Sequence, residues 1–148
     1  MSVEMKKSKK RFGANSKPLP EPTLFLDRNL GRHIIADRLR SEGMKVEVHD
    51  DHLASDAPDE DWISLVGRNH WVAITKDKNI RYRIAELEAI RNHSAQIIVI
   101  RAKNATGADI AALLVKGRRR IARFATATPS PFVGGVYGSG AIKAYPII

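Results

Sequence analysis

The sequence has no cysteine among its 148 residues. This excludes disulfide bonds, thiolate nucleophiles and cysteine-based zinc sites, and it is typical of a reducing compartment. It also lacks any run of about 18 apolar residues, the length that a membrane-spanning helix needs. No apolar segment follows the basic residues near the N-terminus. We therefore expect neither a signal peptide nor a membrane span, and a cytoplasmic protein.

The charge is unevenly distributed along the chain. The overall net charge is +9, but residues 1–20 carry +5, residues 101–123 carry +6, and residues 21–100 carry −3. Basic flanks suit a polyanion, and central carboxylates suit cations. Residues 1–20 contain almost nothing apolar, so we predict a disordered basic arm, either a solvated tail or a contact to nucleic acid or a partner. Residues 21–148 are long enough for a single domain with a sizeable core.

Apolar patterns predict alternating strands and helices. Strands are expected at residues 23–26, 45–48, 71–75 and 96–100, the last central in the sheet, and a hairpin at residues 132–137 and 141–145. Helices are expected at residues 29–41, from about 59 to 66, at 80–90 and, as one long element, at 106–124. The sequence therefore predicts an α/β fold with a mainly parallel sheet, helices on both faces and a C-terminal β-hairpin.

The helical spacing also predicts which side chains pack inward. Those expected inside are Leu30, Ile34, Ile35, Leu39, Ile80, Ile84, Leu87, Ile90, Ile110, Leu113, Leu114, Ile121 and Phe124. Thr106 and Asp109 are spaced to cap the last helix. Arginines of that helix are expected outside, namely Arg118, Arg119, Arg120 and Arg123.

Two aspartates follow predicted strands. Asp27 ends the first strand, and Asp77 lies two residues after Thr75 at the end of the third. Carboxyl ends of parallel strands share one edge of a sheet, where ligands bind, so we expect the two carboxylates to meet. Either aspartate alone is also typical of a turn or a helix cap. Together they would hold Mg²⁺ or Mn²⁺, which can promote phosphodiester hydrolysis.

A third group of acids opens the helix that follows Pro58. The helix dipole favours acids at this end, but Asp59, Glu60 and Asp61 exceed what one helix start requires. At least one of them is therefore expected to face the cleft. By contrast, His49 and His52, in a polar loop with Asp50 and Asp51, match no tetrahedral metal motif, and we expect solvent to hydrate them.

Three motifs are carried at these positions: Leu26-Asp27-x-Asn29-Leu30, Pro58-Asp59-Glu60-x-Trp62 and Thr75-Lys76-Asp77-Lys78-x-Ile80-Arg81. Together they resemble the three motifs of compact PIN-like ribonucleases, in particular the VapC-type toxins of bacterial toxin–antitoxin pairs. The likeness extends over about residues 23–146 and includes the C-terminal hairpin. It implies a PIN fold, a metal-dependent endoribonuclease (a hydrolase acting on RNA) and inhibition by a cognate antitoxin protein.

The resemblance assigns the catalytic, metal-binding acids to Asp27, Asp59 and Asp77. Supporting roles are expected for Asn29, Glu60, Thr75 and Asn79. Many relatives have a second acid where this chain has Asn79, so the site is less negative here.

The charge pattern points to cations that contact RNA. Four of them surround Asp77, where they either neutralise it or bind phosphates. The expected RNA-binding residues are Lys76, Lys78, Arg81, Arg83, Arg118 and Arg119. Both a monomer and a homodimer remain open.

Two other functions compete with the ribonuclease hypothesis. Asp27-x-Asn29 resembles the Asp-x-Asp of haloacid-dehalogenase-like phosphatases, but Asn29 cannot protonate a leaving group. The other alternative is a non-catalytic RNA- or partner-binding domain, in which the acids cap helices. Cleavage of RNA with Mg²⁺ or Mn²⁺, compared with chelator, separates these hypotheses.

Overall fold

In a computed structural model, residues 19–147 are described. The predicted basic arm lies outside these residues except for Leu19 and Pro20. Six strands form one sheet in the order β2-β1-β3-β4-β5-β6. They are β1 (Leu24–Leu26), β2 (Val46–Val48), β3 (Val72–Thr75), β4 (Gln96–Arg101), β5 (Phe132–Tyr137) and β6 (Ile142–Tyr145). The first five are parallel and β6 is antiparallel to β5, which confirms the predicted sheet, hairpin and central fourth strand.

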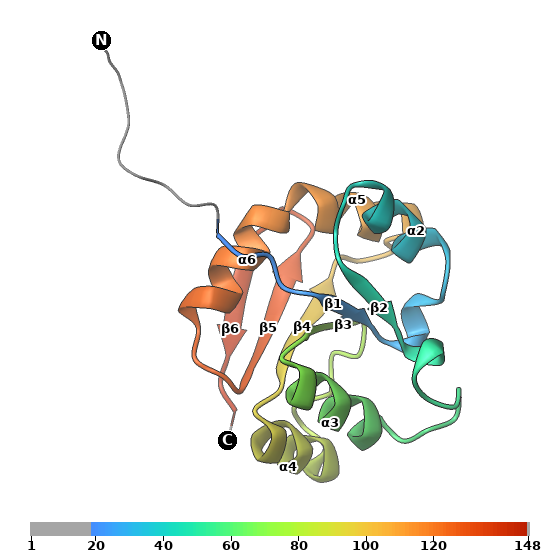
Figure 1. Ribbon diagram of the computed structural model, residues 1–148. Helices are drawn as coiled ribbons and strands as arrows, with labels where there is room; N and C mark the ends of the chain where they lie inside the picture. Colours follow the sequence, from blue (N-terminus) through green and yellow to red (C-terminus); the bar gives the residue numbers. More distant parts are fainter. Residues whose placement is uncertain (1–18, 148) are drawn as a thin grey trace.

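Helices cover both faces of this sheet, as predicted. One layer contains α2 (Ile34–Ser41), α5 (Gly107–Lys116) and α6 (Arg118–Ala127), and the other contains α3 (Asp59–Asn69) and α4 (Ile84–His93) (Figure 1). Two short 3₁₀ turns, η2 (Arg28–Leu30) and η3 (His49–Asp51), follow β1 and β2. No helix within residues 19–147 is long and apolar enough to cross a membrane.

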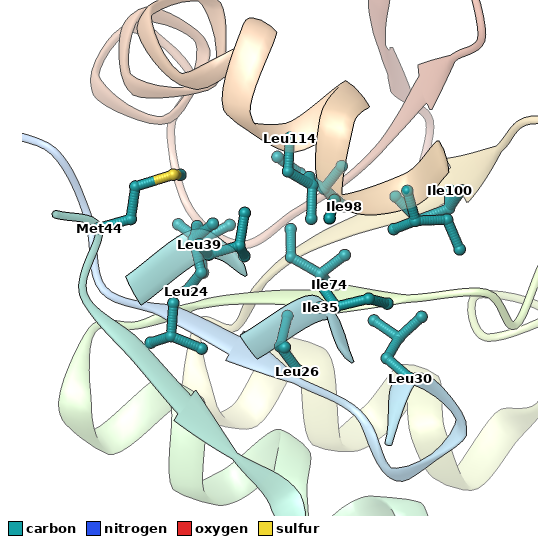
Figure 2. Packing of buried hydrophobic residues seen from close by; sticks show 14 of the residues in the cluster. Leu24, Leu26, Leu30, Ile35, Leu39, Met44, Ile74, Ile98, Ile100 and Leu114 are labelled. Carbon is teal, nitrogen blue, oxygen red and sulfur yellow. The ribbon is translucent and has the colours of Figure 1, made fainter. Parts of the chain in front are cut away.

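The parallel strands are buried on both faces, which explains their continuous apolar sequences. In β1, Leu24 and Leu26 point into the core beneath α2 and α5, as Figure 2 shows, whereas Phe25 points to the α3 side. Phe25 stacks with Trp62 and Trp71, its ring centroid 6.1 Å from each. These contacts fix the position of β1 relative to α3, and therefore of the residues that follow β1.

Two apolar positions are wrong in the sequence prediction. Ile34 and Ile84, expected inside, are 71% and 76% exposed. The helix expected over residues 29–41 is interrupted at Gly31, whose φ of 75° is not helical, so α2 begins only at Ile34. Similarly, α4 begins at Ile84, and Ile80 is buried in the turn before it. When the helical spacing is continued through such a break, the first residue of the helix is wrongly assigned to the buried face.

The long helix expected over residues 106–124 is also wrong in one respect, because it consists of two helices. The predicted cap is present: the Thr106 hydroxyl accepts a hydrogen bond from the Asp109 amide at 3.1 Å, and the Asp109 carboxylate accepts one from the Thr106 amide. However, α5 ends at Gly117, the residue that also precedes α6. Glycine weakens a helix interior, and here the break lets α6 pack against β6.

Candidate functional site

The three predicted site aspartates lie at the edge of the sheet where β1 and β3 end. The Asp27 amide bonds to the Ile74 carbonyl of the neighbouring strand at 3.0 Å, so Asp27 lies beside the end of β3. The Thr75 hydroxyl donates to Asp27 Oδ2 at 2.8 Å and accepts from the Asp77 amide at 3.1 Å. Thr75 therefore holds both strand-end acids, and α3 brings in Asp59 as its first residue. We call Asp27, Asp59 and Asp77 the aspartate site.

Asp27 is the buried member, with only 4% of its surface exposed. Its carboxylate accepts hydrogen bonds from Thr75 and from the Arg28 amide at 2.7 Å. Within residues 19–147 it forms no ion pair with lysine or arginine. Burial raises the pKa of Asp27 and the negative charge of Asp59 adds to this, while the two hydrogen bonds partly oppose it. A cation beside Asp27 would relieve this destabilisation.

Asp59 is oriented by two neighbours. Its Oδ1 accepts hydrogen bonds from Trp62 Nε1 at 3.0 Å and from the Arg28 guanidinium at 3.3 Å. Arg28 also donates to the carbonyls of Ser55 and Ala57, which ties the loop before α3 to the end of β1. Asp59 is thus the acid of the 59–61 group that faces the other two aspartates, whereas Asp61 is exposed to solvent.

Asp77 is paired with Arg83. Its Oδ1 accepts from the Asn79 amide at 3.0 Å, and its Oδ2 forms a hydrogen-bonded ion pair with the Arg83 guanidinium. The same guanidinium nitrogen lies 3.7 Å from Asp59 Oδ2. Because one nitrogen contacts both carboxylates, Arg83 lies between Asp59 and Asp77. The bond to Asp77 raises the pKa of Arg83, which therefore stays charged.

The four cations around Asp77 divide into two kinds. Arg83 neutralises acids, whereas within residues 19–147 none of Lys76, Lys78 and Arg81 pairs with a carboxylate. The expected supporting residues lie nearby in the chain: Asn29 and Asn79 are exposed and Glu60 is half-buried.

The chemistry of the aspartate site fits a divalent cation. Three carboxylates from three elements are the oxygen ligands that Mg²⁺ and Mn²⁺ prefer. Even so, no group of three acidic or histidine side chains in the described part of the chain is close enough to share one ion. Arg83 occupies the space between two of the three carboxylates. A metal ion held by all three would have to displace it.

A cation-lined pocket of about 410 Å³ adjoins this edge where β3 and β4 end. Four basic side chains line it: Lys76, Lys78, Arg101 and Lys103. Arg101 and Lys103 were not among the predicted RNA contacts. Their place at the end of the most apolar strand is the signal that could have found them, since the ends of parallel strands share an edge.

The predicted arginines of α6 have different environments. Arg119 lines a second pocket, of about 290 Å³, next to the turn between β5 and β6. Arg118, expected outside, is instead half-buried: its guanidinium donates to the Glu21 carboxylate at 2.9 Å and to the Glu42 carbonyl at 2.8 Å. Arg118 therefore anchors the segment before β1, which removes much of its capacity to bind RNA.

The loop with two histidines is exposed at Asp50, Asp51 and His52, as expected, but its first histidine is buried. His49 is 1% exposed and packs against Phe25, with ring centroids 6.2 Å apart. Its Nδ1 bonds to Asp50, and its Nε2 has no partner within the described residues. His52 bonds to Glu47 at 2.7 Å. The sequence reasoning missed that His49 lies near Asp27, where a positive charge on its ring would lower the pKa of Asp27.

Comparison with protein-family models matches residues 22–102 to the family described as a PIN like domain. This span is more than half of the chain and contains all three members of the aspartate site. Comparisons with curated proteins and with solved structures give no match. The match agrees with the parallel sheet, the two helical layers and the acids at strand ends. The chain therefore belongs to the PIN-like domain family, whose fold is of the nuclease type.

Proposed function

We propose that this protein is a metal-dependent endoribonuclease that hydrolyses phosphodiester bonds of RNA. The observation that carries this proposal is the aspartate site, which lies beside a pocket lined by basic side chains. Carboxylates can hold divalent cations, and free lysines and arginines can hold phosphates. Membership of a nuclease-type family supports the same chemistry.

Each residue of the site has a role in this proposal. Asp27, Asp59 and Asp77 would hold Mg²⁺ or Mn²⁺, which when bound supplies an activated water and stabilises the leaving oxygen. Thr75 orients Asp27 through its hydroxyl, and Arg28 orients Asp59. Lys76 and Lys78 bind backbone phosphates next to the acids. In this way the lysines position the RNA, while Thr75 and Arg28 keep the carboxylate oxygens of the aspartate site aligned.

The finer proposal is that the chain is the VapC-type toxin of a bacterial toxin–antitoxin pair and acts in the cytoplasm. The three motifs around Asp27, Asp59 and Asp77 support it. The exposed arginines of α6 could also accept an acidic segment of an antitoxin, since opposite charges steer and orient such contacts. A homodimer is compatible with this role.

A non-catalytic RNA-binding domain is the second candidate. One observation favours it: Arg28 and Arg83 already neutralise Asp59 and Asp77. In that case the acids would serve the fold, and the lysines and arginines would serve binding.

Metal-dependent cleavage separates these two functions. We expect mixed RNA to be cleaved with Mg²⁺ or Mn²⁺ and left intact with chelator, because without the metal ion nothing lowers the pKa of the attacking water or stabilises the leaving oxygen. Asp59→Asn should abolish cleavage, and Asp61→Asn, an exposed neighbour in the same helical turn, should not. Gel analysis of end-labelled RNA measures this. Binding without cleavage under every metal condition would instead favour the non-catalytic domain.

Growth on expression tests the toxin role. Induced wild-type protein should arrest bacterial growth, whereas Asp59→Asn expressed to the same level should not, because toxicity would come from RNA cleavage. Colony counts after induction measure the effect. Normal growth with an enzyme that cleaves RNA in vitro would contradict the toxin assignment and leave the nuclease intact.

A further inference from the structure

A group of tyrosines and basic side chains lies on the sheet face that carries α3 and α4. Arg101 pairs in register with Tyr137, Lys143 with Gly135 and Tyr145 with Val133. Paired residues, and residues two apart in a strand, share a face. These side chains therefore stand on the same face as Val133, which packs in the α3 and α4 core.

This part of the face is open to solvent. Lys143 is exposed, and Tyr137 and Tyr145 are half-buried. Figure 1 shows β5 and β6 at the side of the sheet away from β2, with α6 on their other face. Tyr82, in the turn before α4, is 64% exposed and adds a further ring to this surface. We call Arg81, Tyr82, Arg101, Tyr137, Lys143 and Tyr145 the tyrosine face.

Rings and guanidinium groups are stacked together on this face. The Arg81 guanidinium lies 4.5 Å from the centroid of the Tyr82 ring and 4.6 Å from that of Tyr145. The Tyr145 hydroxyl accepts a hydrogen bond from Arg101 at 2.9 Å and lies 2.6 Å from the Tyr137 hydroxyl. A side chain at Gly135 would not fit, because a Cβ there would lie 2.1 Å from that Tyr145 hydroxyl. Glycine at this position lets the Tyr145 ring lie close against the sheet.

Among the described residues, no carboxylate neutralises the positive charge of the tyrosine face. Over residues 19–147, none of Arg81, Arg101 and Lys143 pairs with a carboxylate. Instead, Arg101 and Lys143 each lie 5.7 Å from the centre of the Tyr137 ring. Cation–π contacts orient a basic group but leave its charge available to an anion. Within residues 19–147, the face thus combines three cations that have no carboxylate partner with exposed aromatic surface.

The tyrosine face is continuous with the candidate active site. Arg101 lines the 410 Å³ pocket together with Lys76 and Lys78, which flank Asp77 in the sequence. Arg81 and Tyr82 belong to the same turn as Asp77 and Arg83. A chain of phosphates passing the aspartate site would therefore meet the cations of this face next.

We propose that the tyrosine face binds the single-stranded part of the RNA substrate. Arg81, Arg101 and Lys143 contact its phosphates, and bases stack on Tyr82 and Tyr137. Stacking requires bases that are not already paired within a duplex, so the face selects single strands. This inference rests on the proposed ribonuclease function and adds to it the form of RNA that is bound and the residues that select it.

The test measures binding of a fluorescent ten-nucleotide oligouridylate to the full chain in chelator. We expect Tyr82→Ala with Tyr137→Ala to weaken binding at least about tenfold, because stacking on each ring contributes substantially. Tyr82→Phe with Tyr137→Phe keeps both rings and should retain the affinity. Tyr82→Ala alone, at an exposed position, should give a smaller loss in the same direction. Duplex RNA of the same length should bind more weakly and respond less to these changes.

Charge variants supply an independent measurement. Arg101→Gln and Lys143→Gln should each flatten the log–log dependence of affinity on salt by about 0.7. The matched control is Lys45→Gln, an exposed lysine before β2 at the other end of the sheet, which should change nothing. Wild-type affinity in the folded Tyr82→Ala and Tyr82→Ala/Tyr137→Ala variants would overturn the proposal. A second result would also overturn it: the protein binds polyglutamate and not RNA, and this binding depends on Tyr82. The tyrosine face would then be an interface for an acidic protein.

Failure of this inference differs from failure of the proposed function. Asp59→Asn should bind the oligonucleotide like the wild type and not cleave RNA. If the wild type binds through its tyrosines and never cleaves, the nuclease proposal fails and the tyrosine face stands. If the tyrosine variants cleave and bind RNA like the wild type, only the tyrosine face fails.

Discussion

Asp27→Asn is expected to reduce RNA cleavage about 1,000-fold, equivalent to about 4 kcal/mol of transition-state stabilisation. Asp27 is the one member of the aspartate site without an arginine partner in the described chain, so its charge is the most available to a metal ion. Asparagine keeps an oxygen for the Arg28 amide and an amide for the Thr75 hydroxyl, but it has no negative charge. The variant should therefore lose activity without losing its fold.

Stability should separate this effect from simple damage. The raised pKa of Asp27 means that the folded chain keeps the proton to a higher pH than the unfolded chain does. Stability is therefore lost as pH rises from the ordinary pKa to the raised one, and it is level above that. Asparagine cannot ionise and avoids this loss. In chelator at pH 7, the free energy of unfolding of Asp27→Asn should equal or exceed that of the wild type.

Urea unfolding at pH 4 and pH 7, alongside cleavage rates, measures both effects. Asp61→Asn is the matched control, because Asp61 is exposed and should change neither quantity. If Asp27→Asn is less stable than the wild type at pH 7, then the folded protein stabilises the negative charge of Asp27, contrary to the prediction. A variant that still cleaves at the wild-type rate would show that Asp27 does not belong to the reaction.

The strand-end acids were predictable because their positions depend on local signals and on one general rule. The apolar strand before each aspartate is legible in the sequence, and parallel strands end at one edge. The convergence of Asp27 and Asp77 beside Thr75 follows from these two facts. The likeness of the motif around Asp59 to the PIN-like pattern then singled out that acid from its two neighbours.

The partners of the acids were not predictable in the same way. Arg28 reaches Asp59 across 31 positions of the chain, and Arg118 reaches Glu21 across 97. An arginine side chain is long and flexible. Its position in the sequence therefore predicts the direction in which it leaves the backbone, but not the carboxylate with which it pairs. The breaks at Gly31 and Gly117 are a second limit. Apolar spacing continued through both positions and masked the local signal for a break, which is the glycine itself.

Arg83 shows how such a partner changes the chemistry of a site. The sequence left open whether the cations near Asp77 neutralise it or bind phosphates. The structure divides these roles: Arg83 lies between Asp59 and Asp77, whereas Lys76 and Lys78 line a pocket. Arg83 is thus a competitor for any metal ion that the same carboxylates hold.

Arg83→Gln is therefore expected to increase the affinity for Mn²⁺ about 30-fold. A positive charge about 4 Å from a bound cation opposes binding by up to about 4 kcal/mol per unit charge in a partly polar environment. The Arg83 side chain is 43% exposed, so screening reduces this to about 2 kcal/mol. Glutamine removes the charge and keeps part of the side-chain length. Calorimetric titration of the metal-free protein with Mn²⁺ measures the change.

Two comparisons make this result specific to Arg83. Arg83→Lys keeps the charge and should stay near the wild-type affinity, which would exclude a mere effect of losing the guanidinium shape. Arg68→Gln removes an arginine of α3 that bonds only to Ser64 among the described residues, and it should leave Mn²⁺ binding unchanged. Equal affinities for Mn²⁺ in the wild type and Arg83→Gln would mean that Arg83 does not compete with the ion. If Mn²⁺ binds more tightly to Arg83→Gln, and not to Arg83→Lys or Arg68→Gln, then the charge of Arg83 competes with the metal ion for the carboxylates of the aspartate site.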